Sequence, residues 1–252
     1  MKRLESVVLL AIFAAGISFG QVGPLRTGFA VVTPITGGKL AFSVTETFTE
    51  RFDGNLLQST VQPSPLATLT SMVVSSDPAS ATNTGIAILD PLDVPANVTL
   101  TLVDRQGVII GARTIIIERR QQRSRFLTEL FAGVPEVSES FTGQLFISSD
   151  IPVAVLALAF SGPFFTAIPA TQLSGIDNLD SSNLNGALFL PQVASGGGWV
   201  STITVANTSI LPQSVRIEFF DSSNGSMNVP ITFSIPNTIV QPGGVVSFST
   251  AR

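Results

Sequence analysis

Apolar and polar residues alternate along most of the chain after residue 25. This period places apolar side chains on one face of an extended strand and polar side chains on the other, as in an antiparallel sheet with one buried face. The alternation is clearest in residues 98–102, 215–219, 231–235 and 246–248. Glycine, proline and asparagine interrupt the runs at short intervals, as turns do. The pattern predicts an all-β protein, and the lack of alternating helices excludes a doubly wound sheet.

Residues 86–104 return without a gap in residues 203–221, at a separation of 117 positions (203 − 86). Ile86 aligns with Ile203, while a proline and a closing aspartate also keep their places. Further along, residues 125–127 match residues 247–249 at a separation of 122 (247 − 125), so that about five additional residues of the second copy lie in a loop. A fixed internal period decides the architecture. The sequence therefore predicts two copies of one β domain.

The two copies are predicted to span residues 25–131 and 140–252, and each is close to the common size of a domain. Residues 132–139 contain glycine, proline and glutamate, a composition typical of a linker. About seven or eight strands per copy suit an immunoglobulin-like β-sandwich. The chain has no cysteine, so the prediction stops at immunoglobulin-like architecture. Residues 125–131 (RFLTELF) are also compatible with a helical turn at the junction.

The N-terminus predicts a secretory signal peptide over residues 1–20. A basic start, the apolar run 7–15 and small residues within 18–20 match the three parts of such a peptide. The apolar run is too short to span a bilayer, and so is the later run 151–160. We therefore expect a secreted, periplasmic or cell-surface protein with no membrane span in the mature chain.

Several phrases along the chain resemble tandem modules of large secreted bacterial proteins. The phrases are residues 125–131 (RFLTELF), 141–143 (FTG), 148–155 (SSDIPVAV) and 189–199 (FLPQVASGGGW). The resemblance covers most of residues 25–252. Those modules resemble β-sandwiches and have no assigned activity, so the resemblance implies a surface or secreted building block. It carries over no catalytic residue.

The chain has no histidine, cysteine or tyrosine, which removes the usual base near neutral pH and the triads built on it. A Ser–Lys dyad would have to use Lys39, which we interpret as an ordinary surface lysine. Glu46 and Glu50 are the closest carboxylates in an aromatic setting. On one strand face they would lie about 13 Å apart, whereas a glycosidase needs about 5 to 10 Å. We predict no enzyme activity, catalytic residue or cofactor.

Hard oxygen ligands gather in residues 177–186 (DNLDSSNLNG), as Ca²⁺ prefers. The spacing is not that of an EF-hand, and such runs are also ordinary turn chemistry, so whether this loop binds calcium stays open. No metal ligand is predicted. Residues 104–107 and 221–225 are interpreted as hairpin turns, in which the aspartate side chain bonds the turn backbone.

Two groups of residues are candidates for ligand contact. Arg119, Arg120 and Arg123, with Arg125 beside them, could bind a polyanion, although a soluble hairpin loop explains them as well. The matching stretch of the second copy is uncharged, so the fold does not require this cluster. The only tryptophan, Trp199, follows three glycines and could stack on a sugar ring or cap the core.

Removal of the signal peptide leaves 11 basic and 16 acidic residues (13 − 2 and 17 − 1), a balance that argues against nucleic-acid binding. The sequence predicts a non-catalytic, structural or adhesion-type module whose partners are an extracellular polysaccharide or a surface protein. The alternative is a carbohydrate-binding module that uses Trp199 and adjacent loops. A third hypothesis is assembly by edge-strand pairing, because few lysines guard the strand edges.

Overall fold

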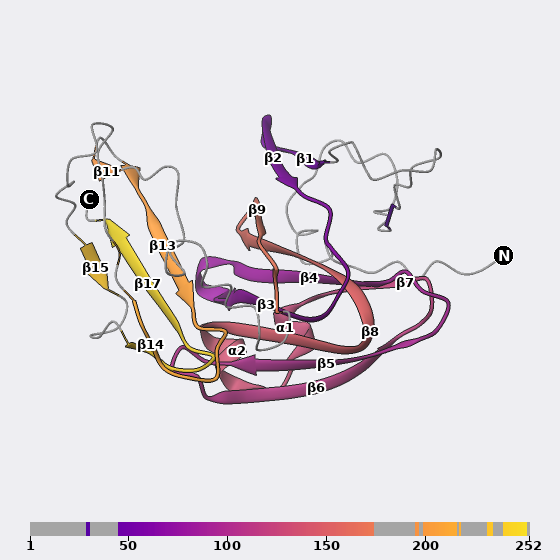
Figure 1. Ribbon diagram of the computed structural model, residues 1–252. Helices are drawn as coiled ribbons and strands as arrows, with labels where there is room; N and C mark the ends of the chain where they lie inside the picture. Colours follow the sequence, from indigo (N-terminus) through magenta and orange to yellow (C-terminus); the bar gives the residue numbers. More distant parts are fainter. Residues whose placement is uncertain are drawn as a thin grey trace, which may run out of the picture.

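Figure 1 shows the computed structural model of the protein, which describes residues 29–30, 45–173, 195–196, 199–215, 217, 231–233 and 239–250. In these ranges the chain is mostly antiparallel β-strand, with short helices in one place. The predicted all-β class is confirmed. The predicted signal peptide lies outside the described residues.

The first part of the chain contains ten strands and three short helical elements among the described residues. In chain order they are β1 (Glu46–Phe52), β2 (Asn55–Val61), β3 (Ala67–Ser76), the 3-10 turn η1 (Pro78–Ser80), β4 (Thr82–Asp90), β5 (Ala96–Val103), β6 (Ile109–Ile117), β7 (Gln121–Phe126), α1 (Leu127–Leu130), α2 (Pro135–Glu139), β8 (Phe141–Ser161), β9 (Phe164–Ile168) and β10 (Thr171–Gln172). The remaining strands are β11 (Ser195–Gly196), β12 (Trp199–Val200), β13 (Thr202–Ala206), β14 (Gln213–Ser214), β15 (Ile231–Phe233), β16 (Ile239–Val240) and β17 (Val245–Thr250).

Strand β8 is shared by the two sheets of a sandwich and holds them together (Figure 1). Its first half lies between β3 and β5, in a sheet of order β10-β3-β8-β5-β6. Its second half lies between β9 and β4, in a sheet of order β9-β8-β4-β7. The change of sheet falls near Pro152, which has no N–H to give to a ladder. One strand of 21 residues therefore replaces the two strands that the sequence pattern indicates there.

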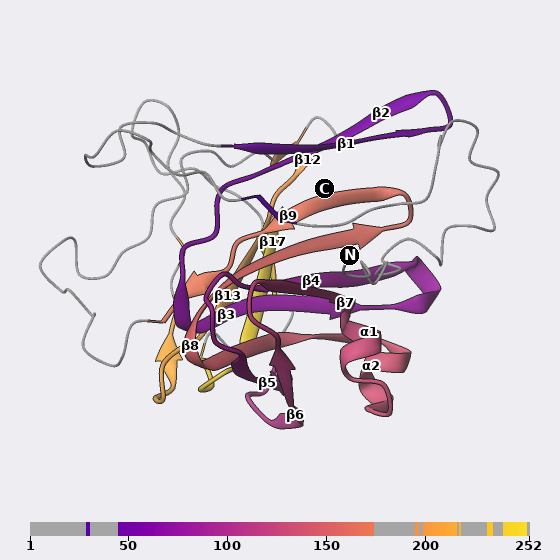
Figure 2. The same ribbon diagram turned by 90° about the vertical axis from the view of Figure 1, so that its right-hand side faces the viewer.

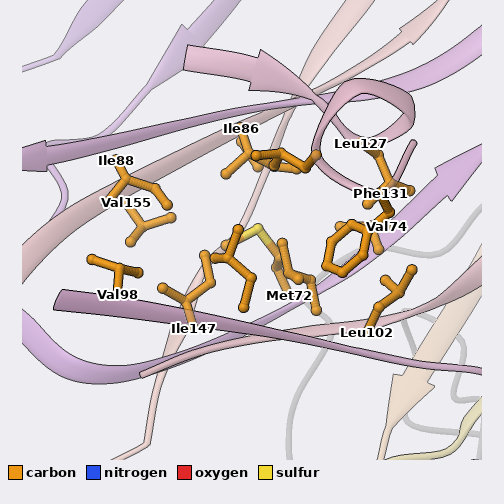
Figure 3. Packing of buried hydrophobic residues seen from close by; sticks show 14 of the residues in the cluster. Met72, Val74, Ile86, Ile88, Val98, Leu102, Leu127, Phe131, Ile147 and Val155 are labelled. Atoms are coloured by element: carbon orange, nitrogen blue, oxygen red, sulfur yellow. The ribbon is translucent and has the colours of Figure 1, made fainter. Parts of the chain in front are cut away.

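The core lies between the two sheets and is closed at one end by the helices. Figure 3 shows Met72, Val98 and Ile147 of one sheet facing Ile86 and Val155 of the other. Leu127 and Leu130 of α1, Phe131 and Val137 of α2 complete the buried cluster. Figure 2 shows α1 and α2 together at this end of the sandwich. Burial of these alternating apolar residues stabilises the fold, by about 25 cal/mol for each Å² of apolar surface removed from water.

The helices correct the predicted domain boundary. Residues 135–139, predicted as part of a linker, form α2, and the side chain of Val137 is fully buried. The Ser76 hydroxyl donates a hydrogen bond of 2.8 Å to the carbonyl of Val137. Strand β8, predicted to open a second domain, is central to the first sandwich. The proline that suggests a linker stands in the first turn of α2, where proline is also favoured.

The predicted helical turn in residues 125–131 is present as α1. The backbone N–H of Phe126 donates a hydrogen bond of 2.8 Å to the Glu129 carboxylate, which thereby closes the first turn. The predicted turn at residues 104–107 is also present. Asp104 Oδ1 accepts bonds from the N–H groups of Gln106 (2.9 Å) and Val108 (2.8 Å). The matching turn at residues 221–225 lies outside the described residues.

The C-terminal strands repeat the pairing registers of β4 to β7. Ile86 of β4 faces Arg125 of β7, and Ile203 of β13 faces Phe248 of β17. The two registers coincide after shifts of 117 (203 − 86) and 123 (248 − 125) positions. The same shifts relate the pairing of β5 with β6 to that of β14 with β16, in which Ala96–Ile117 corresponds to Gln213–Val240. The second shift is therefore 123, one more than the sequence alignment indicates.

Two turns show the same correspondence. Asp90 Oδ1 accepts a hydrogen bond of 2.8 Å from the N–H of Leu92, and Asn207 Oδ1 accepts one of 3.0 Å from that of Ser209. Before β7 and before β17, a residue with positive φ occupies the third position of a turn closed by a backbone hydrogen bond: Arg120 (φ 53°) and Gly243 (φ 71°). The C-terminal strands also have their own small core of Val240, Val246 and Phe248.

Candidate functional site

The predicted arginine cluster lies on the turn between β6 and β7 and on β7 itself. Arg120 forms an ion pair with Asp93, with Nε and Oδ1 2.7 Å apart. Both side chains are exposed, so the pair stabilises the fold by less than about 1 kcal/mol. The backbone N–H of Arg120 also donates to the carbonyl of Leu92 (3.1 Å), which holds the 90–93 loop against the turn. The role of Arg120 is therefore structural.

Arg119 and Arg123 are exposed, and Arg123 shares one face of β7 with the half-buried Arg125. Strand β7 is an edge strand of its sheet among the described residues, since it pairs only with β4. Charges on an edge strand oppose pairing with another chain. Nearby, the guanidinium of Arg113 donates to the carbonyl of Leu130 and thus satisfies the end of α1. These arginines form a basic edge, with no cavity beside it among the described residues.

The other candidates are placed less completely. Glu46 and Glu50 lie on β1, opposite Val61 and Leu57 of β2, in regular extended backbone. The backbone of Trp199 pairs with Gly196 in the β11–β12 hairpin, while its side chain lies outside the described part of the chain. Lys39 and residues 177–186 also lie outside it. Within the described residues, no three carboxylates come close enough together to hold a metal ion.

A cavity of about 360 Å³ opens between the β2–β3 connection and the β9–β10 connection. The hydroxyl of Ser64 donates to the carbonyl of Val155 (2.7 Å), and the Ser59 hydroxyl accepts from the N–H of Ala167 (3.1 Å), so both walls are anchored to the sandwich. Its lining is uncharged: Thr60, Val61, Gln62, Pro63, Ser64, Pro65, Thr70, Val155, Leu156, Ala167, Ile168, Pro169, Ala170 and Gln172. Such a lining can accept a neutral ligand but offers no acid or base.

A buried joint connects the sandwich to the C-terminal strands. Gln144 of β8 is fully buried, and its Oε1 accepts a hydrogen bond of 2.7 Å from the hydroxyl of Ser71. Its Nε2 donates to the carbonyls of Asn207 and Gly244, each at 3.1 Å. Every hydrogen-bonding group of this side chain therefore has a partner, as a buried amide requires. The partners come from β3 and from the two ends of the β13–β17 pair.

The amide of Asn207 extends the joint into the C-terminal core. Its Nδ2 donates to the carbonyls of Leu211 (2.8 Å) and Val240 (3.0 Å). On the other side, the N–H of Val245 donates to the carbonyl of Arg105 at 3.1 Å. A Cβ atom on Gly107 would lie 2.2 Å from the carbonyl oxygen of Pro242, so the two turns touch through bare backbone. The joint consists of neutral groups.

Sequence reasoning did not find the cavity or the joint. Both are built by segments far apart in the chain, and Gln144 stands in an alternating strand like any polar residue. No signal in the local pattern distinguishes a buried glutamine from an exposed one. The arginines were placed correctly on a hairpin, because turn residues and charge are local features.

No family model and no curated protein matches the chain. Among solved structures, one from Thermotoga maritima, titled "Crystal Structure of Thermotoga maritima 1070", is similar at 13% identity and a TM-score of 0.32. The similarity covers 42% of this chain and 90% of that one. In the described residues, no helix has the length and apolar character needed to cross a bilayer.

Proposed function

We propose that the protein is a non-catalytic structural or adhesion-type module, exported by residues 1–20 to the periplasm or the cell surface. The buried joint around Gln144 carries this proposal. It fixes the C-terminal strands on the sandwich through neutral hydrogen bonds, an arrangement that gives a rigid spacer or a rigid binding face. The described residues hold no cluster of acidic or basic groups that would serve a reaction.

Residues 85–126 and 202–249 are proposed to be two copies of one immunoglobulin-like strand unit. The shared pairing registers support this interpretation, because register is set independently in each hairpin. The shared Asx turns and positive-φ turns support it further. Tandem copies joined without a flexible linker suit a protein that holds other groups at a defined distance.

Export and lack of catalysis are tested together on the full chain. Expressed with its N-terminal segment in a bacterium, the protein should be recovered outside the cytoplasm with Gln21 as its first residue. The purified mature protein should turn over no polysaccharide or ester substrate, whereas arrays of glycans and surface proteins should reveal any adhesive partner. Cytoplasmic protein that keeps Met1, or turnover that is lost in Glu46→Gln or Glu50→Gln, would contradict the proposal.

The uncharged cavity favours a second candidate function, binding of a neutral carbohydrate. Trp199 is the only tryptophan, so its fluorescence reports on binding near the C-terminal strands without labelling. Titration with neutral oligosaccharides should change this signal or give heat of binding. Gln62→Ala at the cavity should weaken the effect, and Gln58→Ala, on the same strand but outside the cavity, should leave it unchanged. Equal behaviour of both variants would exclude the cavity.

A further inference from the structure

Strand β13 has one edge that no other described strand covers. It pairs with β17 on the opposite edge, next to the hydrogen bond of 2.9 Å from the N–H of Asn207 to the carbonyl of Gly244. Bonded and non-bonded pairs alternate in an antiparallel ladder, so Ile203 and Val205 also bond to β17. The N–H and C=O groups of Thr202, Thr204 and Ala206 then point to the second edge. Among the described residues no strand pairs with β13 there.

The corresponding edge of β4 is covered. Strand β8 lies against it, with Ala157 opposite Ile86 and Val155 opposite Ile88. Under the shift of 117 positions, Ile86 and Ile88 correspond to Ile203 and Val205 of β13. The C-terminal strand group therefore presents the edge that the first group fills with an apolar strand.

This edge has no charged guard. Residues 181–215 contain no Asp, Glu, Lys or Arg, and β13 contains no proline. The edge strands β6 and β7 of the first group carry Arg113, Arg123 and Arg125. Natural proteins protect exposed strand edges with charges, prolines or bulges because a bare edge recruits another strand. The difference between these edges indicates that β13 is an association surface.

We propose that two copies of the chain associate through β13, antiparallel about a two-fold axis at Thr204. In this register Ile203 faces Val205 of the second copy on the inner face, so apolar residues meet as they do between β4 and β8. The two Thr204 residues exchange backbone hydrogen bonds, and Thr202 does so with Ala206 of the second copy. The β15-β17-β13 sheets of both copies become one continuous sheet.

The partner is a second copy because β13 is complementary to itself in sequence and face. The inference rests on strand registers and edge charge, and it does not depend on the proposed function. An active enzyme could associate in the same way, and a structural module could remain a monomer. The outcome of the test below therefore bears on this inference alone.

Sedimentation of the full mature chain over a wide concentration range tests the proposal. The wild type should pass from one chain to two as concentration rises. Thr204→Pro removes an edge N–H without touching the β17 ladder, a position at which proline is tolerated. Thr204→Lys places like charges opposite each other across the axis. Each variant should weaken association by about tenfold or more. Thr114→Lys, on the exposed face of edge strand β6, should associate like the wild type.

Circular dichroism decides whether each variant is folded, and if Thr204→Pro unfolds the protein, Thr204→Lys decides the question. A wild type that stays monomeric at every concentration would overturn the proposal. Association that persists unchanged in the folded Thr204 variants would also overturn it, because the contact would then lie elsewhere. Loss of association in Thr114→Lys as well would assign the effect to net charge and contradict pairing through β13.

Discussion

At the scale of single residues, Gln144 shows how much can depend on one buried amide. Its four hydrogen-bonding contacts are to Ser71, Asn207 and Gly244, counting both atoms of the amide, with no exposure to water. A buried polar group contributes little net stability while it is paired, but its removal leaves its partners unsatisfied. The partners here belong to different strand groups, so loss of this residue affects the connection between them.

We predict that Gln144→Met, which keeps the volume but removes the hydrogen bonds, lowers the free energy of unfolding by about 2 to 4 kcal/mol. Urea denaturation measures the change. Gln106→Met, at an exposed position of the β5–β6 turn, should cost less than about 0.5 kcal/mol and serves as the control. Equal costs for the two variants would mean that the amide of Gln144 does not hold the joint.

Asp150 provides a pH-dependent contact at the point where β8 changes sheets. The side chain and backbone N–H groups of Asn97 donate to its carboxylate at 2.6 and 2.8 Å, and they lower the pKa of Asp150 below its model-peptide value of 3.8. A lowered folded-state pKa stabilises the protein above pH 3.8, and the effect disappears as the pH falls through the folded-state pKa.

The melting temperature of Asp150→Asn should therefore lie below that of the wild type at neutral pH, and the difference should shrink as the pH falls below 3.8. Asn97→Ala removes the donor side chain and should reduce the same pH dependence. A difference between wild type and Asp150→Asn that is constant from pH 7 down to about pH 2 would contradict this assignment.

At the scale of elements, turns connect the strand groups by close backbone contact. Gly107 (φ 89°) and Gly54 (φ 77°) both stand in hairpin turns with positive φ. A Cβ atom on Gly107 would collide with the carbonyl of Pro242, whereas one on Gly54 would meet nothing within 4 Å. The pair therefore separates backbone strain from contact between turns.

Gly54→Ala is expected to cost about 1 kcal/mol, the strain of a left-handed residue that is not glycine. Gly107→Ala should cost at least about 1 kcal/mol more, because its turn must also move away from residues 241–244. Urea denaturation of both variants measures the difference. Equal costs would show that the two turns are not in contact in solution.

The elements also show how far local patterns extend. Alternation predicted β5, β13 and β17 because each buries one face, and the period of 117 positions placed Ile86 and Ile203 on corresponding strands. The boundary at residues 132–139 was misjudged because glycine and proline mark a helix start as well as a linker. The role of β8 could not be predicted, since its partners are chosen by packing against strands up to about 80 residues away.

At the scale of the whole molecule, the sandwich and the C-terminal strands form one body with a neutral, buried connection. Cα neighbours aside, the connection includes the Gln144 amide, the bond from Val245 to Arg105 and the contact of Gly107 with Pro242. Independent beads on a flexible linker would lack all three. The candidate sites follow from this architecture: the basic edge lies on β7, the cavity lies beside β9, and the open edge lies on β13.

Calorimetry of the full mature chain tests this unity most directly. One cooperative transition, with equal calorimetric and van't Hoff enthalpies, is expected for the wild type, and Gln144→Met should divide it into two or lower it as a whole. Two separate transitions in the wild type, with only one of them changed in Gln144→Met, would contradict a single rigid body. The rigid-spacer function would then lose its main support.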